Sequence, residues 1–302
     1  MDANLHVSVL AKEVLELVPE SAKIAFDGTL GGGGHTRLLL EKKLHVVASD
    51  LDAKAIELVT GTLAEDLALR LETVHMSFVD ALKFQDRKFD FILADLGFSS
   101  NQLDNSGRGF SYLKRDDLLD LRYDRTSGTA CWKRMKKIGP KDITNVIYRN
   151  SGEALAGKIG VAFSNVLAEH REPTVGDFVD AIDAIIPNFL KKKTNSILSR
   201  VWQALRIWTN FELELLTQFL QLIPDKLNTN GVAAIICFHS LEDKLVTKFF
   251  RSISAPIVID AYGNTEHKFE LLTKKPIIPS VEEVANNVRS RSAMLRAVHK
   301  AS

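Results

Sequence analysis

One segment near the start of the chain constrains the fold more than any other. The residues Asp27-Gly-Thr-Leu-Gly-Gly-Gly-Gly-His35 follow at once on a short apolar run, 23–27, and a stretch with helical spacing comes next, at 36–43. Glycines let the backbone turn sharply and approach a ligand closely. A strand, a glycine-rich turn and a helix in this order predict the first unit of a parallel α/β sheet with a ligand at the turn.

The chain then continues to alternate between strand and helix patterns, with one long interruption. The expected elements are a strand at 44–50, a helix at 53–69, strands at 72–76 and 89–95, an irregular stretch at 97–129, mainly helix at 142–186 with Thr174 as an N-cap, an amphipathic helix at 205–222, and a strand at 231–238. This order predicts one α/β sheet interrupted by an inserted helical domain. We expect residues 1–104 and 201–302 to form the core and 105–200 the insertion.

The spacing of the glycines narrows the class of ligand. The dinucleotide pattern G-x-G-x-x-G fails, because the third glycine would fall on Thr36, and no Lys-Ser or Lys-Thr pair follows to make a P-loop. Asp27-x-x-x-Gly31-x-Gly33 instead fits the first motif of Rossmann-like methyltransferases. Asp50 ends the second strand, where a carboxylate can hold both ribose hydroxyls. Asp52 is the nearby alternative, and an ordinary turn with a surface aspartate would explain the same residues.

Further segments, taken in chain order, resemble the RsmH (MraW) family of ribosomal RNA small subunit methyltransferases. They are HVSVLAKEVLELV, DGTLGGGGHT, DLDAKAI, ILADLGFSSNQLD, RGFSY, LDLRYD, QALRIWTN, CFHSLEDKLVTKFF, KKPIIPS and RSRSAMLRA. The resemblance covers nearly the whole chain. It implies a class I S-adenosylmethionine-dependent methyltransferase core with a helical insertion. It also implies transfer of a methyl group from that cofactor to the exocyclic N4 of a cytidine in 16S rRNA, near the decoding centre.

The same resemblance implies a set of cofactor-binding residues where the motifs match. They are Gly33, Gly34, His35, Asp50, Phe78, Asp95 and Gln102. Two other functions stay open: a methyltransferase that acts on a different substrate, and a non-catalytic ribosome-assembly factor that has kept the cofactor fold as a scaffold.

Candidate catalytic residues follow the fourth and the last predicted strands. Asp95 is expected to orient the amino group of the base or the cofactor, and Phe98 either stacks on the base or, more simply, packs in the core. His239 and Ser240 are candidate substrate contacts. An equally good interpretation makes Ser240 the N-cap of a helix and Asp243 its capping-box partner.

The charge distribution indicates a phosphate-bearing partner or, equally, a solvated helical surface. Residues 101–206 hold 18 lysines and arginines against 12 aspartates and glutamates, although the whole chain has a net charge of +1. The candidate rim for RNA phosphates comprises Arg108, Arg122, Lys133, Arg134, Lys136, Lys137, Lys191, Lys192, Lys193, Arg206, Arg289, Arg291 and Arg296. With the resemblance, this makes 16S rRNA or the small ribosomal subunit the expected partner. The family also includes homodimers, so a homodimer is possible.

Several classes of protein are not expected from this sequence. The two cysteines, Cys131 and Cys237, cannot build a disulfide framework and suit a reducing compartment, and neither has the context of a nucleophile. No Cys and His cluster has metal-ligand spacing, so no metal is expected. With no signal-peptide pattern and no run of about 18 apolar residues, we predict a cytoplasmic protein without a membrane span.

Overall fold

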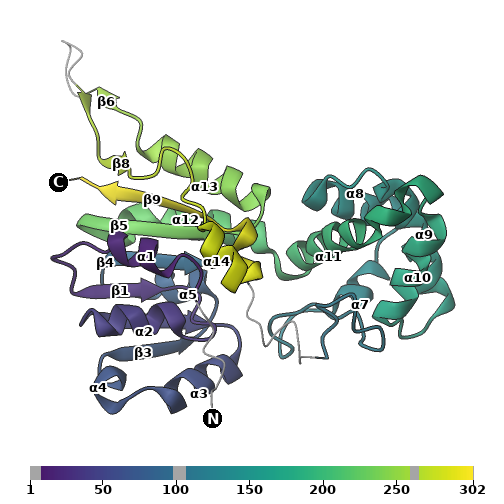
Figure 1. Cartoon of the computed structure of the whole chain (residues 1–302), viewed down its shortest axis with the longest axis horizontal. Coiled ribbons are helices and arrows are strands. Elements are labelled where there is room, and N and C mark those ends of the chain that lie inside the picture. The colour runs from purple at the N-terminus through teal and green to yellow at the C-terminus, as the bar shows by residue number, and fades with distance from the viewer. Residues whose placement is uncertain (1–7, 98–106, 259–264, 302) are drawn as a thin grey trace. The chain divides into compact units, whose positions relative to one another are not determined.

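The computed structural model describes residues 8–97, 107–258 and 265–301. The chain divides into two compact units, the first formed by 1–98 with 213–302 and the second by 99–212. The first unit contains the β-sheet, and the second is mainly helical (Figure 1).

The first unit is built on a seven-stranded sheet with the order β3-β2-β1-β4-β5-β9-β8. Its strands are β1 Ile24–Asp27, β2 His45–Asp50, β3 Leu71–His75, β4 Phe89–Asp95, β5 Leu227–Cys237, β8 Phe269–Leu271 and β9 Met294–Lys300. The neighbours from β3 to β5 pair in parallel, whereas β9 is antiparallel to both β5 and β8. A separate hairpin pairs β6 Ile257–Val258 with β7 Thr265–Glu266. The predicted Rossmann-like class I methyltransferase core is confirmed by this strand order.

Both faces of the sheet are buried at β4, which explains why its residues 91–94 are all apolar. Phe91 and Leu93 pack in one hydrophobic cluster with side chains of α1, α2 and α3. Ile92 and Ala94 pack in the other with side chains of α5, α12 and α13. Successive side chains of a strand point to opposite faces, so each cluster takes every second residue. The helices of this unit are α1 Ala11–Leu17, α2 Gly34–Glu41, α3 Ala53–Thr62, α4 Glu65–Ala68, α5 Phe78–Lys83, α12 Glu212–Lys226, α13 Ser240–Ile253, α14 Val281–Asn286 and the 3-10 helix η2 Val288–Ser292.

The second unit has a hydrophobic core of its own, built by helices. They are α7 Cys131–Met135, α8 Pro140–Ser151, α9 Ala156–Glu169, α10 Val175–Ile185, the 3-10 helix η1 Asn188–Lys193 and α11 Thr194–Asn210. The predicted N-cap at Thr174 is confirmed. Its side chain accepts from the Asp177 backbone, and the Asp177 carboxylate accepts from the Thr174 backbone, which completes a capping box.

Two predicted helices are wrong in their extent. The helix expected at 205–222 is two helices, because Phe211 has a left-handed φ of 55° between α11 and α12. Arg134 donates to the carbonyl oxygens of Trp208 and Thr209, at 2.7 and 3.1 Å, and so satisfies the end of α11. The helix expected at 53–69 also breaks, since Leu63 is extended. The apolar spacing continues across both breaks, so periodicity alone could not reveal them.

No helix within the described residues combines the length and the apolar content that crossing a membrane requires.

Candidate active site

The glycine-rich loop lies across the carboxyl ends of three neighbouring strands. Gly28 donates its backbone N–H to the Leu93 oxygen of β4 at 2.8 Å, and Leu30 donates to the Ser49 oxygen of β2 at 2.9 Å. Gly31 donates to Asp50 Oδ2 at 2.8 Å. The loop is therefore held from both sides at the sheet edge where ligands of parallel α/β proteins bind.

The Asp27 carboxylate holds the glycine-rich loop in place through hydrogen bonds, a role that the motif alone did not reveal. Its carboxylate is 1% exposed and accepts from Thr36 Oγ1 at 2.6 Å and from the Thr29 backbone at 3.0 Å. Burial raises the pKa of Asp27 above its usual value, and these two hydrogen bonds oppose that rise. Because both oxygens are occupied by the loop and by α2, we interpret Asp27 as a structural residue.

Asp50 and Asp52 have different surroundings at the end of β2. Asp50 accepts from the backbone of Gly31 and of Asp52, both at 2.8 Å, so it faces the glycine loop. Asp52 is the N-cap of α3 and accepts from the Lys54 backbone at 3.1 Å. A carboxylate has about four acceptor positions, so Asp50 keeps capacity for further donors. This geometry favours Asp50 over Asp52 as the ribose acid.

Phe78 lies beside the same loop, at the first position of α5. The ring of Phe78 meets the Phe219 ring edge-on, with centroids 5.0 Å apart. A side-chain carbon added at Gly28 would come within 3.0 Å of the Phe78 Cβ. Phe78 is thus half-buried against the hydrophobic core while it borders the glycine loop. Its predicted contact with the adenine ring stays a prediction.

Asp95, at the end of β4, is the most perturbed carboxyl group at this edge. Its backbone N–H donates to Thr29 Oγ1 at 2.6 Å, which ties β4 to the loop. The Asp95 side chain is 20% exposed. Its Oδ1 atom is buried, and no described residue donates a hydrogen bond to it. Burial raises the pKa of Asp95 from 3.8 to about 7, opposed by a hydrogen bond from the Gly97 backbone and reinforced by the charges of Asp27 and Glu242.

His35 faces Asp95 from the first turn of α2. Its Nε2 atom is 3.7 Å from Asp95 Oδ2, and the residue is 7% exposed. Gly33 is the N-cap of α2 and Gly34 its first residue, so the predicted loop contacts Gly33, Gly34 and His35 form one continuous turn next to Asp95. Of the other predicted site residues, Phe98 and Gln102 lie outside the described residues.

The predicted helix start at Ser240 is wrong by one residue. His239 is the N-cap of α13 and Glu242 its capping-box partner. His239 Nδ1 accepts from the Glu242 backbone at 3.3 Å, and Nε2 lies 3.1 Å from Glu242 Oε1. Glu242 Oε2 in turn accepts from the backbone of Phe238 at 2.8 Å. His239 thus serves the helix start, Ser240 is exposed, and their predicted substrate contacts stay predictions.

Comparison with known proteins identifies the family of this chain. The model of the MraW methylase family matches residues 3–301. The chain belongs to this family. As a MraW methylase it uses S-adenosylmethionine, which confirms the expected cofactor.

Individual relatives align over nearly their full length. A protein of Ehrlichia canis called "Ribosomal RNA small subunit methyltransferase H" is 34% identical over 98% of this chain and 100% of its own. A protein of Nostoc punctiforme with the same name is 36% identical over 98% of this chain and 94% of its own. A solved structure of a putative methyltransferase from Streptococcus mutans in complex with SAH aligns over 96% of each chain, with 12% identity and a TM-score of 0.45.

The residues of this MraW methylase fit the chemistry of S-adenosylmethionine. That molecule carries a cationic sulfonium, an ammonium group and a ribose diol. The sheet edge offers Asp50 for the diol and a turn of glycines for close approach. Asp95 adds a buried oxygen that lacks a donor among the described residues. An acidic edge of this kind complements a cationic ligand.

We expect Asp50→Ala to weaken S-adenosylmethionine binding by roughly 10- to 100-fold, because hydrogen bonds to a charged acceptor are worth about 1.5–3 kcal/mol. Asp52→Ala is the matched control. It should cost about 1 kcal/mol of unfolding free energy through the lost N-cap and leave affinity nearly unchanged. Calorimetric titration with the cofactor and thermal unfolding of both variants measure this. An affinity loss confined to Asp52→Ala would reverse the assignment.

The two cysteines of this MraW methylase do not serve as nucleophiles. Both are fully buried. Burial raises the pKa of Cys131 to about 12 and that of Cys237 well above its usual value. A thiol that stays protonated at neutral pH is inert, since the thiolate is the reactive form. The predicted absence of a cysteine nucleophile therefore agrees with the structure.

Several basic residues of the predicted phosphate rim are engaged inside the protein instead. Arg206 pairs with Glu212 at 2.9 and 3.0 Å, and Arg296 with Asp243 at 2.7 and 3.1 Å; each arginine is under 10% exposed. Because burying a charge is costly unless it is paired, these ion pairs belong to the fold. Including Arg206 and Arg296 in the rim was wrong.

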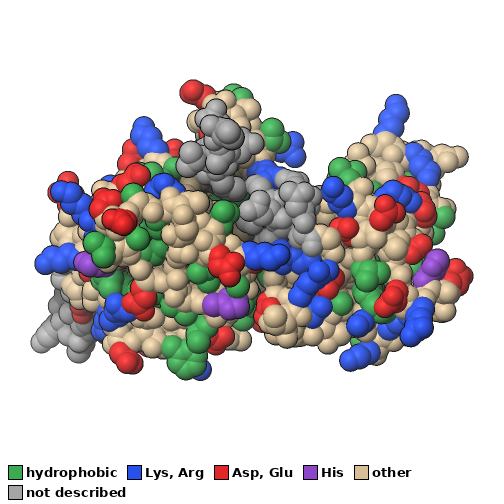
Figure 2. Space-filling model, turned by 90° about the horizontal axis from the view of Figure 1, so that it is seen from below, with side chains coloured by type: hydrophobic (Ala, Val, Ile, Leu, Met, Phe, Trp, Pro, Cys, Tyr) green, Lys and Arg blue, Asp and Glu red, His purple; other side chains and the backbone are tan. Residues whose placement is uncertain are grey.

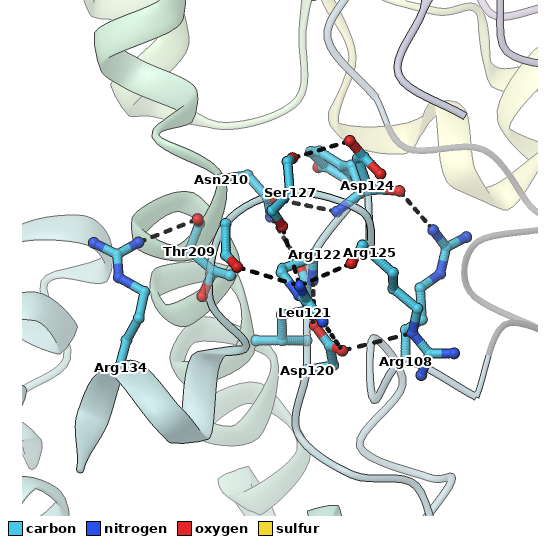
Figure 3. A network of polar contacts seen from close by, with 12 residues as sticks. Arg108, Asp120, Leu121, Arg122, Asp124, Arg125, Ser127, Arg134, Thr209 and Asn210 are labelled. Carbon is cyan, nitrogen blue, oxygen red and sulfur yellow. Dashed lines mark hydrogen bonds and ion pairs between the residues drawn. The ribbon is translucent and has the colours of Figure 1, made fainter. Parts of the chain in front are cut away.

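The loop from 107 to 129, expected to be irregular, is organised by arginines. Arg122 makes a bidentate pair with Asp120, and its Nη1 donates to the backbone oxygens of Arg125 and Ser127 at 3.0 Å (Figure 3). Asn210 donates to the Leu121 oxygen and accepts from the Tyr123 backbone, at 2.7 and 3.0 Å. Arg122 is therefore another structural residue rather than a rim residue. Side-chain hydrogen bonds replace regular secondary structure here.

Of the remaining rim residues, Arg108 and Arg134 are half-buried and donate to backbone oxygens, Arg108 to that of Tyr123 at 2.7 Å and Arg134 to those at the end of α11. The others lie on the surface. Lys133, Lys137, Lys191, Lys192, Lys193, Arg289 and Arg291 are exposed. Lys136 is also exposed, but it donates to the carbonyl oxygens of His170 and Arg171 at 2.9 and 2.8 Å. On the face seen in Figure 2, lysine and arginine side chains are interspersed with acidic ones rather than gathered in one patch.

Proposed function

We propose that this MraW methylase transfers a methyl group from S-adenosylmethionine to the exocyclic N4 of a cytidine in 16S rRNA, near the decoding centre. The names of the relatives support small-subunit ribosomal RNA as the substrate. The observation that carries the reaction is Asp95. One oxygen of its carboxylate is buried at the end of β4 and accepts no hydrogen bond from the residues that the structure describes.

S-adenosylmethionine, when bound, supplies a methyl group on a sulfonium, and transfer to nitrogen is a direct displacement. The task of the protein is to align donor and acceptor. Asp50 would hold the ribose, and the turn from Gly33 to His35 would pass beneath the methionine end. Asp50 ends β2 and the glycine turn begins α2, so the ends of these elements position both groups.

The cytosine amino nitrogen is a poor nucleophile, because its lone pair is delocalised into the ring. In our proposal Asp95 accepts a hydrogen bond from this amino group, which localises the lone pair, and then takes up the proton. A pKa of about 7 suits this task, since a general base works best when its pKa is near the working pH. The site therefore couples nucleophile activation to a carboxylate that is partly ionised at neutral pH.

A paired cytosine hides its N4 in the duplex, so the target must be unstacked. Single-stranded loops of folded RNA present such bases. We assign recognition of the surrounding rRNA to the second unit, 99–212. Its excess of basic residues supports contact with phosphates. A homodimer and the absence of metal remain predictions from the sequence.

The test is methyl transfer from labelled S-adenosylmethionine to small ribosomal subunits from a strain that lacks the gene. Digestion of the RNA and chromatography of the nucleosides should place the label in N4-methylcytidine. Asp50→Ala should lose that label. Cofactor binding without any labelled nucleoside would contradict the proposal and favour an assembly factor, and label in another nucleoside would change the substrate atom.

A further inference from the structure

Phe189 is the most exposed aromatic side chain among the described residues, with 81% of its surface accessible. It belongs to η1, the short 3-10 helix between α10 and α11 in the second unit. Burial of a phenylalanine side chain in a hydrophobic core stabilises a protein, and this residue forgoes that gain. An exposed ring on an ordered turn is a feature that packing does not explain.

The neighbouring Leu190 fixes the orientation of this turn. Leu190 is partly buried against the core of the second unit, and its backbone donates to the Pro187 oxygen at 2.8 Å. Phe189 therefore points away from the core. In a 3-10 helix, side chains three residues apart eclipse each other, so Phe189 and Lys192 share one face. A phenyl ring and an ammonium group are thus presented on the same face of this turn.

The charge around η1 is of one sign along the chain. From 188 to 193, the extent of η1, the sequence has three lysines and no aspartate or glutamate. Lys191 donates to the Asp183 backbone oxygen, which ties it to α10. Lys192 and Lys193 are exposed, and no residue in the described ranges accepts a hydrogen bond from either. These two ammonium groups are available to an anionic partner.

We propose that η1 is an RNA contact site, in which Phe189 stacks on an unpaired base and Lys192 and Lys193 neutralise the adjoining phosphates. An aromatic platform beside cationic side chains is how proteins bind single-stranded nucleic acid. This inference rests on the proposed function, because it takes ribosomal RNA as the ligand. It adds a second contact, at a turn that no cofactor or catalytic motif includes.

An anionic membrane is the other partner that lysines and an exposed phenylalanine can bind. Interfacial helices, however, present a broad apolar face to the lipid. The apolar face of α11 is used inside the second unit, where Ile197, Val201 and Leu205 are at most 2% exposed. The exposed apolar group at η1 is therefore the single ring of Phe189, which is large enough to stack on one base but too small to bind a lipid surface.

The test compares two triple variants of the full-length protein. F189A/K192A/K193A removes the proposed contact. Y148A/K141A/K158A is the matched control, because it removes one exposed aromatic and two exposed lysines from α8 and α9 of the same unit. Binding to unmethylated small ribosomal subunits is measured over a range of salt concentrations, with cofactor titration to verify that the first unit is intact.

We expect the η1 variant to bind subunits at least tenfold more weakly, the size of effect that loss of one stacked base produces. The slope of log affinity against log salt should fall by about two, one for each lysine. KM for subunits should rise while kcat at saturation and cofactor affinity stay unchanged.

Equal losses in both variants would overturn the inference and leave only general electrostatics. So would normal subunit binding by the η1 variant together with lost binding to phosphatidylglycerol vesicles. If the wild type made no N4-methylcytidine and the η1 variant still lost subunit affinity, the proposed function would fail while the contact stood.

Discussion

Replacing Asp95 by asparagine is expected to lower kcat by about 100-fold or more and, at neutral pH, to raise the free energy of unfolding. Asparagine keeps the shape but cannot take up the amino proton, and general-base catalysis contributes about 10²–10⁴. The stability gain comes from removal of a buried negative charge that sits near Asp27 and Glu242. Activity and stability thus change in opposite directions.

The free energy of unfolding of the wild type is expected to fall as the pH rises toward neutrality. The pKa of Asp95 is raised from 3.8 to about 7, so the folded protein binds this proton more tightly than the unfolded chain. The stabilising contribution of Asp95 is fully present below pH 3.8 and is lost as pH rises through about 7. Urea unfolding between pH 5 and 8 should show this loss in the wild type and not in D95N.

Two further measurements make the prediction for Asp95 decisive. The kcat/KM of the wild type should rise with pH through about 7, because the carboxylate is the active form, and D95N should lack this rise. Asp52→Asn is the matched control, since asparagine caps a helix as well as aspartate does. Full activity of D95N on small subunits would remove Asp95 from the catalytic step.

Gly33→Ala should have the largest effect on the glycine loop, with loss of both stability and cofactor binding. Gly33 has a φ of +77°, which costs a residue with a side chain about 1–2 kcal/mol. The new Cβ would also come within 2.7 and 2.8 Å of the two Val59 methyl groups. Overpacking of this kind typically costs another 1–3 kcal/mol, so we expect a total of roughly 2–5 kcal/mol.

A second glycine provides a control in which the same substitution is expected to stabilise the protein. Gly61 lies in α3, and nothing lies within 4 Å of the position of an added Cβ. Gly61→Ala should therefore stabilise the protein by up to about 1 kcal/mol and leave cofactor affinity unchanged. In G33A/V59A the steric clash is relieved while the backbone strain remains, so part of the loss should be recovered. A G33A protein with wild-type stability would contradict this account.

Much of the geometry of the candidate site could be predicted because its motifs are local. Gly33, Gly34 and His35 are consecutive, and Asp50 and Asp95 end strands that are apolar runs in the sequence. The carboxyl ends of parallel strands meet at one edge of a sheet, so these residues come together once the strand order is known. The division of roles between Asp50 and Asp52 was not decidable, because both follow the same strand.

The predictions that failed concern residues whose partners are distant or whose boundaries lack a sequence signal. The sequence predicts Arg296 as an RNA contact, yet its carboxylate partner Asp243 lies 53 positions away along the chain. The start of α13 at His239 depended on an imidazole acting as a cap acceptor, which residue preferences do not suggest. The break at Phe211 occurs inside a continuous apolar pattern.

The sequence by itself determined the alternation of strands and helices, the glycine turn and its acid, and membership of the family, because these depend on periodicity and on short motifs. Only the tertiary structure decided which charges are structural and which are exposed, and that Asp95 is a carboxyl group with a pKa near neutrality. Burial, and the distances between groups far apart in the chain, set those properties. Both arise from packing, which a linear pattern does not contain.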